Sequence, residues 1–315
     1  MADLPNHVTI VEEGPREGFQ SEARTFPLAE RARFIEALAA TGLGEINCCS
    51  FVDPKRVPQM ADSETLARTV QRRPGTRYVG LWLNDRGFQR ARATPLDLDG
   101  ILIASASETF GKRNNNRDRA ELLTEQRRML EAYKDAGVKV GGLYVFTAFG
   151  CNYEGDVPLE AVMGAAADLI TLCAEHDIRP SHLYLCDTVG AANPRLVEKT
   201  VGAVRERWPD MRIGLHLHDT RGLGLANASA GLRLGVDRFD ASCAGLGGCP
   251  FAANRAAAGN ICTEDFAFMC EEMGVATGID VEALVDCARS VESLVGHPLP
   301  GKLMKAGTLS KFRSH

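Results

Sequence analysis

Short runs of apolar residues alternate with longer amphipathic segments along most of this chain of 315 residues. The short runs have the length of buried β-strands, and the longer segments repeat their apolar positions with the period of an α-helix. Eight strands are predicted, at residues 8–13, 45–51, 78–83, 101–105, 140–146, 183–186, 212–218 and 239–244. Helical patterns lie between them, at residues 28–40, 63–72, 118–136, 159–176, 194–208 and 223–234.

Strands that alternate with helices over about 250 residues predict the α/β class and, within it, a (β/α)₈ TIM barrel. A doubly wound open sheet is the alternative, but eight similar units favour closure of the sheet. Beyond the eighth strand the pattern is helical only, with a loose tail at the end. We therefore predict a catalytic barrel over residues 6–262, followed by a short C-terminal extension of helices and tail over residues 263–315.

Charge and composition limit the kinds of binding partner and the cellular location that we expect for the protein. The formal net charge is −5, which predicts neither a nucleic-acid surface nor binding to an anionic membrane. No apolar run reaches the roughly 20 residues that cross a bilayer, and the N-terminal residues have neither signal-peptide nor transit-peptide character. The ten cysteines are scattered without paired spacing, as is typical of buried thiols in a reducing compartment. We expect a cytoplasmic protein.

The segment His216-Leu217-His218-Asp219 carries the strongest chemical signal in the chain. Alternate side chains of a strand share a face, so His216 and His218 point the same way. Catalytic residues of such barrels lie at the carboxyl ends of the strands, where Glu17 adds a carboxylate and Asn260 an amide oxygen. Nitrogen and oxygen donors of this kind predict a divalent ion with open coordination positions, such as Mg²⁺, Mn²⁺ or Zn²⁺.

Two more residues at strand exits could take part in a reaction of a carbonyl compound, by stabilising an enolate or by transferring a proton. Arg16, beside the candidate metal ligand, is placed to stabilise an enolate oxygen, and a structural ion pair with Glu12 or Asp187 is the alternative role. Cys249 differs from the other cysteines because it lies in a glycine-rich loop at residues 245–250, which suits movement over a ligand. We favour proton transfer by this thiol over covalent catalysis, with a structural role as the alternative.

These blocks closely resemble hydroxymethylglutaryl-CoA lyases, in the wider group of metal-dependent barrels that includes isopropylmalate, citramalate and homocitrate synthases. The resemblance extends from about Val8 to Val281. The Gly-Leu-Gly-Gly-Cys-Pro loop at residues 245–250 is specific to the lyase branch, whereas the His-x-His-Asp block is shared with the synthases. The other matching blocks are at residues 14–18, 50–60, 106–108, 150–155, 259–260 and 263–265.

The resemblance implies a retro-Claisen-type cleavage of hydroxymethylglutaryl-CoA to acetyl-CoA and acetoacetate. It also implies an acyl-CoA partner, a homodimer, and a divalent ion, with Mg²⁺ or Mn²⁺ favoured over Zn²⁺. It assigns a role to each matching position: Glu17, His216, His218 and Asn260 as metal ligands, Arg16 for the enolate, Cys249 for a proton in a mobile loop, Asp187 near the substrate hydroxyl with Glu12 as support, and Ser107 and Tyr153 along the substrate region.

Three departures from the usual lyase pattern concern the substrate more than the reaction. Glu17 replaces the usual aspartate, and the segment at residues 251–258 is two residues longer than usual and adds Arg255. Asn47, which we assign to substrate binding, replaces a glutamate and thereby removes a negative charge from the rim. The alternatives are a lyase for another 3-hydroxyacyl-CoA such as citramalyl-CoA, a Claisen-condensing synthase, and an inactive ligand-binding barrel.

Overall fold

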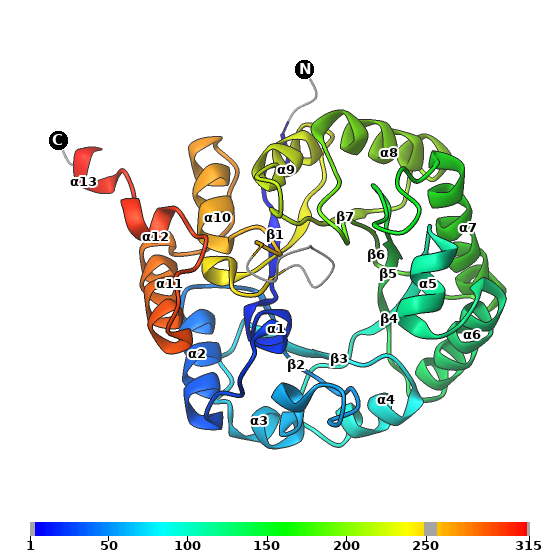
Figure 1. The fold of residues 1–315 in the computed structure, drawn as a ribbon, viewed down its shortest axis with the longest axis horizontal. Helices are drawn as coiled ribbons and strands as arrows, with labels where there is room; N and C mark the ends of the chain where they lie inside the picture. Colours follow the sequence, from blue (N-terminus) through cyan, green and yellow to red (C-terminus); the bar gives the residue numbers. More distant parts are fainter. Residues whose placement is uncertain (1–3, 249–256, 314–315) are drawn as a thin grey trace.

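The computed structural model describes residues 4–248 and 257–313 of the chain. Eight parallel strands form one curled sheet surrounded by helices, which confirms the predicted fold class (Figure 1). The strands are β1 (Thr9–Glu12), β2 (Glu45–Ser50), β3 (Arg77–Leu81), β4 (Gly100–Ser105), β5 (Val140–Phe146), β6 (His182–Cys186), β7 (Ile213–His216) and β8 (Arg238–Ala241). Each overlaps a run that the sequence predicts as a strand.

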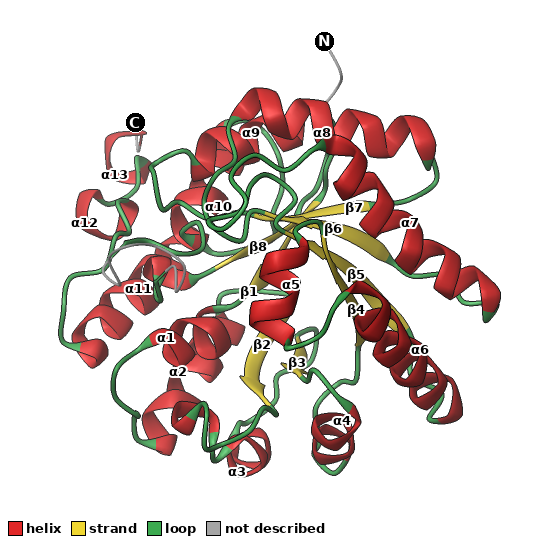
Figure 2. Cartoon of the chain, turned by 45° about the vertical axis from the view of Figure 1, so that its right-hand side comes forward, coloured by secondary structure: helices red, strands yellow, loops and turns green. Residues whose placement is uncertain are grey.

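The helices cover the outside of the sheet, and short helical turns follow some of the strands (Figure 2). The outer helices are α2 (Leu28–Ala40), α3 (Ser63–Thr69), α4 (Asp85–Arg92), α6 (Arg119–Asp135), α7 (Leu159–Glu175), α8 (Pro194–Arg207) and α9 (Gly224–Arg233). The shorter elements and the helix α5 at strand exits are η1 (Gly14–Gly18), α1 (Phe19–Ser21), η2 (Pro58–Met60), α5 (Glu108–Asn115) and η3 (Cys243–Gly245).

The C-terminal segment adds four helices on one side of the barrel, beside β1 and α2 (Figure 1). They are α10 (Thr263–Glu272), α11 (Val281–Val295), α12 (Leu303–Ala306) and α13 (Ser310–Arg313). Helix α10 contacts β1 and α11 contacts α2, so the extension covers the side of the barrel where the chain begins. Among the helices that the structure describes, none has the length and apolar character needed to cross a membrane.

The sheet has a seam between β3 and β4. The strand order is β3-β2-β1-β8-β7-β6-β5-β4, so these two strands are the ends of the hydrogen-bonded ladder within the described chain. Side-chain hydrogen bonds, together with a backbone bond from the segment before β4, connect the two edges instead. Arg77 donates to Asp99 across 3.1 Å at the amino ends of the strands. The indole of Trp82 donates to the Tyr133 hydroxyl at 2.7 Å, and that hydroxyl donates to the carbonyl of Ile101 at 3.2 Å.

Candidate active site

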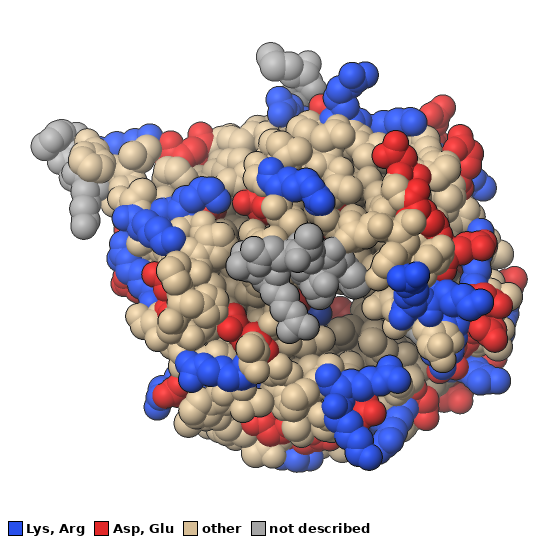
Figure 3. Space-filling view, viewed as in Figure 1, with Lys and Arg blue, Asp and Glu red and all other residues tan. Residues whose placement is uncertain are grey.

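A cavity of about 700 Å³ extends from the carboxyl ends of the strands into the barrel, and all eight strands contribute to its wall. Figure 3 shows a hollow near the centre of the corresponding face of the molecule, with Lys and Arg side chains around it. The interior of a barrel of this kind is usually filled by side chains. Here Leu81, Ile101 and Tyr144 point inward and remain half-buried, because they line the cavity.

The two sides of the cavity differ in chemistry. The wall formed by β1, β2, β7 and β8 carries ionisable and amide groups, among them Glu13, Asn47 and Asp240. The opposite wall, formed by β3, β4 and β5, is largely apolar, with Val79 and Ile103 among its residues. A ligand in this cavity would therefore have its reacting polar groups on one side and apolar contacts on the other.

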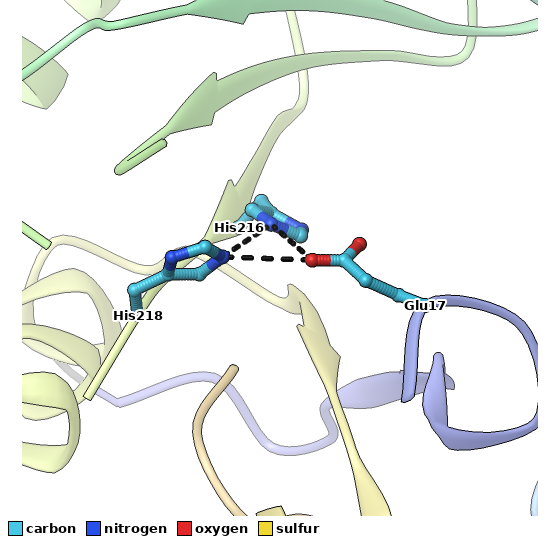
Figure 4. A group of neighbouring side chains, drawn as sticks. All are labelled: Glu17, His216 and His218. Atoms are coloured by element: carbon cyan, nitrogen blue, oxygen red, sulfur yellow. Dashed lines mark hydrogen bonds and ion pairs between the residues drawn. The ribbon is translucent and has the colours of Figure 1, made fainter. Parts of the chain in front are cut away.

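Glu17, His216 and His218 meet at the carboxyl end of the charged wall. Their ligand atoms all lie within 4.8 Å of one another, and Figure 4 shows the three side chains pointing toward a common point. The Glu17 Oε1 atom lies 3.9 Å from His216 Nε2 and 3.6 Å from His218 Nε2, and the two imidazole nitrogens are 3.2 Å apart. Turn η1 brings the carboxylate over the barrel, while the end of β7 presents the imidazoles.

The surroundings of the triad keep its carboxylate ionised. Burial opposes ionisation of Glu17, but the Arg16 guanidinium and the two imidazoles outweigh it and hold the pKa of this carboxyl well below its usual range. An ionised carboxylate beside two imidazoles is the donor set that a divalent cation binds. The Oδ1 atom of Asn260 is also buried and has no hydrogen-bond partner among the described residues, so it remains free to accept a metal bond. The residues present fit a divalent ion.

Asn260 lies beside the triad because its backbone forms an antiparallel bridge with His218. Asp240, which the sequence analysis did not select, supports the other imidazole, since its Oδ2 lies 3.1 Å from His216 Nδ1. Burial disfavours the charged imidazole of His216, but Asp240 and Glu17 outweigh burial and raise its pKa. An aspartate at an inward position of a buried strand is the signal that would have identified Asp240.

Arg16 lies between two carboxylates on the charged wall. Its guanidinium forms an ion pair with Glu13 and a second one with Glu17, where Nη1 and Oε2 are 3.0 Å apart. Its Nε atom is buried and has no hydrogen-bond partner among the described residues. The side chain is thus held in place and keeps an unused donor.

Asn47 contacts the same group of charges. Its Nδ2 atom lies 3.2 Å from each carboxylate oxygen of Glu13. Asn47 was expected to remove a negative charge from the rim, but Glu13 supplies a carboxylate at this place. Burial raises the pKa of Glu13 above its usual range, and the adjacent Arg16 guanidinium acts in the opposite direction. The sequence did not identify Glu13, because its contacts are with a residue on another strand and it carries no motif of its own.

Glu12 is fully buried and joins the exits of two strands to the start of a helix. One of its oxygens accepts hydrogen bonds from the backbone N–H groups of Gly14 and Cys243, both at 2.8 Å, and the other accepts from the Thr263 hydroxyl at 2.6 Å. Burial raises its pKa to about 7, although these hydrogen bonds act against the shift. The carboxylate thus fixes η1, which carries Arg16, to the end of β8 and the start of α10.

Asp187 follows β6 and is also buried. Its Oδ1 accepts hydrogen bonds from the N–H groups of Ala191 at 2.7 Å and Ala192 at 3.0 Å, whereas its Oδ2 has no hydrogen-bond partner among the described residues. Burial raises the pKa of this carboxyl, and the nearby imidazoles of His218 and His216 partly offset that effect. One oxygen is therefore held in place and the other has no partner in the described part of the chain, although Asp187 is not among the residues that line the cavity.

Ser107 and Tyr153 are not among the residues that line the cavity with the triad. Ser107 caps α5 by accepting from the Phe110 N–H at 3.1 Å, and its hydroxyl lies 3.1 Å from the Cys151 sulfur. Tyr153 is 43% exposed, with the Arg113 guanidinium 4.3 Å above its ring. Both belong to the rim formed by the loops after β4 and β5.

Cys249 and Arg255 lie outside the described residues. The described ends of their loop are joined, because Gly248 and Ala258 form an antiparallel bridge. Gly248 also lines the cavity, so the loop begins at the cavity wall.

The profile of the HMGL-like family matches residues 7–291 of the chain. The hydroxymethylglutaryl-CoA lyase of Bacillus subtilis is 37% identical over 298 residues, which are 95% of this chain and 96% of that protein. The 3-hydroxy-3-isohexenylglutaryl-CoA/hydroxymethylglutaryl-CoA lyase of Pseudomonas aeruginosa is 36% identical over 96% of this chain and 98% of its own length. The (R)-citramalyl-CoA lyase of Chloroflexus aurantiacus is 36% identical over 95% of each chain.

Solved structures of similar proteins have the same fold. The crystal structure of the B. subtilis lyase matches with a TM-score of 0.89 at 37% identity, covering 96% of this chain and 98% of that one. The structure of an HMG-CoA lyase from Acenitobacter baumannii, in complex with coenzyme A and 3-methylmalate, matches with a TM-score of 0.86 at 35% identity and covers 98% of both chains.

Proposed function

Since the chain belongs to the HMGL-like family, we propose that it is a divalent-metal-dependent acyl-CoA lyase that cleaves hydroxymethylglutaryl-CoA to acetyl-CoA and acetoacetate. The observation that carries this proposal is the meeting of Glu17, His216 and His218 on the wall of a deep cavity, with Arg16 beside them. The carbon–carbon bond between the thioester's α-carbon and the hydroxyl-bearing carbon breaks. The hydroxyl loses its proton and becomes the ketone of acetoacetate, while the enolate of acetyl-CoA takes up a proton.

Glu17, His216, His218 and Asn260 would hold the ion, for which Mg²⁺ or Mn²⁺ is our first choice and Zn²⁺ the next. A bound divalent ion supplies Lewis-acid polarisation of substrate oxygens. The remaining steps belong to side chains of this protein. The free Oδ2 of Asp187, whose pKa is raised, accepts the hydroxyl proton, and the Arg16 guanidinium stabilises the enolate oxygen. Cys249 delivers the proton to the enolate carbon.

For the binding of the ester, we assign Asn47 to the acyl group and Ser107 and Tyr153 to the outer part of the thioester, on the rim around the cavity. Glu12 supports the site by holding η1 in place. We also propose that the protein forms a homodimer, as its resemblance to the lyases suggested, and that it acts in the cytoplasm, as its scattered cysteines suggested. Size-exclusion chromatography with light scattering tests the homodimer.

The apolar wall of the cavity favours a second candidate substrate. A methyl group on the reacting carbon needs little of the surface that Val79, Ile101 and Ile103 offer. A 3-hydroxyglutaryl thioester with a longer apolar substituent, such as the isohexenyl ester in the name of the P. aeruginosa relative, would use it. Citramalyl-CoA, which would give pyruvate and acetyl-CoA, is the third candidate because one relative bears that name.

The test is release of acetyl-CoA from the three esters at one pH, with the protein first treated with a chelator and then reloaded with Mg²⁺, Mn²⁺ or Zn²⁺. We expect release from hydroxymethylglutaryl-CoA only after reloading, and almost none from the His216→Ala protein. A tenfold higher kcat/KM for another ester would change the substrate. Release from none of the three, or full activity of the chelated protein, would contradict the proposal.

A further inference from the structure

The charged wall of the cavity contains a carboxylate–amide pair, Glu13 and Asn47, which belongs to neither the metal triad nor its direct support. Glu13 lies at the exit of β1 and Asn47 in β2, and both are at least nine-tenths buried. The Asn47 amide donates toward both oxygens of Glu13, and the same carboxylate pairs with Arg16. The amide and the guanidinium therefore share one carboxylate between two strands.

Arg16 needs the carboxylate of Glu13 because its other ion-pair partner, Glu17, belongs to the metal triad. Glu17 is 3.0 Å from Arg16, but it is also the carboxylate that faces the two imidazoles. A guanidinium paired with Glu17 alone would compete for the oxygens of the triad. Glu13 offers Arg16 an acceptor outside the triad, so that Arg16 can be fixed while Glu17 remains available.

The Glu13–Asn47 pair spans two neighbouring strands of the charged wall. In this chain the acidic group stands on β1 and the amide on β2, with 3.2 Å between their polar atoms. The net charge of the pair remains −1 when carboxylate and amide exchange strands.

We propose that Glu13 is the positioning residue of Arg16, that the Asn47 amide holds Glu13 in place, and that carboxylate and amide can exchange strands without loss of this task. This inference rests on the proposed lyase function for its catalytic readout. The other ionisable groups that face Glu13 are Glu17 and Asp240, both negative, and the imidazole of His216. A second carboxylate added at position 47 would therefore be repelled, whereas a carboxylate that replaces Glu13 would not.

A double-mutant cycle tests the exchange. Glu13→Gln should lower kcat roughly 10- to 100-fold, the range typical of removing an orienting partner, with a smaller change in KM. Asn47→Glu alone should also lower kcat, because it places two carboxylates together. The double variant Glu13→Gln/Asn47→Glu should recover most of the lost activity, since it restores one carboxylate and one amide. Asp168→Asn, which breaks the Arg119–Asp168 ion pair on the outer helices, is the control and should keep the parental kcat.

A second readout does not depend on turnover. Phenylglyoxal modifies arginine side chains, and a guanidinium held by a carboxylate reacts more slowly. Modification of Arg16, followed by peptide mass spectrometry, should be faster in Glu13→Gln and should return toward the parental rate in the double variant. Circular dichroism and thermal unfolding of each variant show whether it is folded.

The two readouts separate failure of this inference from failure of the lyase assignment. If the parental protein cleaves none of the esters, the lyase function is wrong, and the rate of Arg16 modification still decides the role of Glu13. Unchanged kcat and unchanged Arg16 modification in folded Glu13→Gln would overturn the inference. A folded double variant in which the two losses simply multiply would also overturn the exchange of roles.

Discussion

At the scale of single residues, the contact between Asp240 and His216 fixes one imidazole of the candidate metal triad. The carboxylate is 3.1 Å from Nδ1, which leaves Nε2 directed toward Glu17 and His218. We expect Asp240→Asn to weaken divalent-metal binding roughly 10- to 100-fold, because partners of this kind orient the ligand and raise its basicity. Titration calorimetry with Mn²⁺ measures the change. Asp237→Asn, at a surface ion pair, is the matched control, and equal affinities for the two variants would refute this role.

A second residue-scale prediction concerns Glu264, which is buried and accepts a hydrogen bond from the Ala244 N–H at 2.8 Å. Burial raises its pKa to about 8, well above the value of about 4.3 in an unfolded chain. The folded state therefore binds the proton more tightly, and the contribution of this group to stability is lost as pH rises from about 4.5 to 8. Glu264→Gln cannot titrate, so its free energy of unfolding should increase relative to the parental protein over this range.

Urea unfolding of both proteins at pH 5, 6.5 and 8 measures this difference. The exposed Glu131 provides the control, because Glu131→Gln removes a carboxylate without changing a buried group. A difference between Glu264→Gln and the parental protein that stays constant from pH 5 to 8 would show that Glu264 does not titrate in this range.

At the scale of elements, the seam between β3 and β4 depends on side chains where other strand pairs have a backbone ladder. Tyr133 from α6 is central, because its hydroxyl accepts from Trp82 and donates to the Ile101 carbonyl. Tyr133→Phe should leave the buried indole N–H without its partner and cost about 1–3 kcal/mol of stability. Urea unfolding measures the loss. Tyr153→Phe, at an exposed ring, should change stability by less than about 0.5 kcal/mol. Equal stabilities of the two variants would mean that the seam does not need this contact.

The elements also show what the sequence can and cannot predict. All eight strands were predictable because buried parallel strands are continuous apolar runs. Helix α4 was missed, since it is short and polar, although Asn84 caps it by accepting from the Gly87 N–H at 2.9 Å. The imidazoles and Glu17 were found from strand exits and motif spacing. Glu13 and Asp240 were not, because their roles arise from contacts between strands that are distant in sequence or carry no motif.

At the scale of the whole molecule, the seam and the cavity belong together. The apolar wall of the cavity is formed by β3, β4 and β5, and β3 and β4 are the strands that do not pair. The charged wall is formed by strands that pair continuously from β2 through β1 and β8 to β7. The half of the barrel away from the seam thus carries the ionisable groups, and the half with the seam offers the apolar space for the acyl group.

This division predicts that substrate size and catalysis can be changed separately. Ile101 points into the cavity from β4 and remains half-buried, so a larger side chain there fills space without touching the triad. Ile101→Phe should lower kcat/KM for 3-hydroxy-3-isohexenylglutaryl-CoA about 10- to 200-fold more than for hydroxymethylglutaryl-CoA. The larger side chain would take the space of the long apolar substituent, whereas the methyl group of the smaller ester needs little of that space. Leu309→Phe, at an exposed position near the C-terminus, should leave both values unchanged. Acetyl-CoA release from the two esters measures the ratio. If Ile101→Phe lowers kcat/KM equally for both esters, the apolar wall does not receive the substituent, and the cavity serves another part of the thioester.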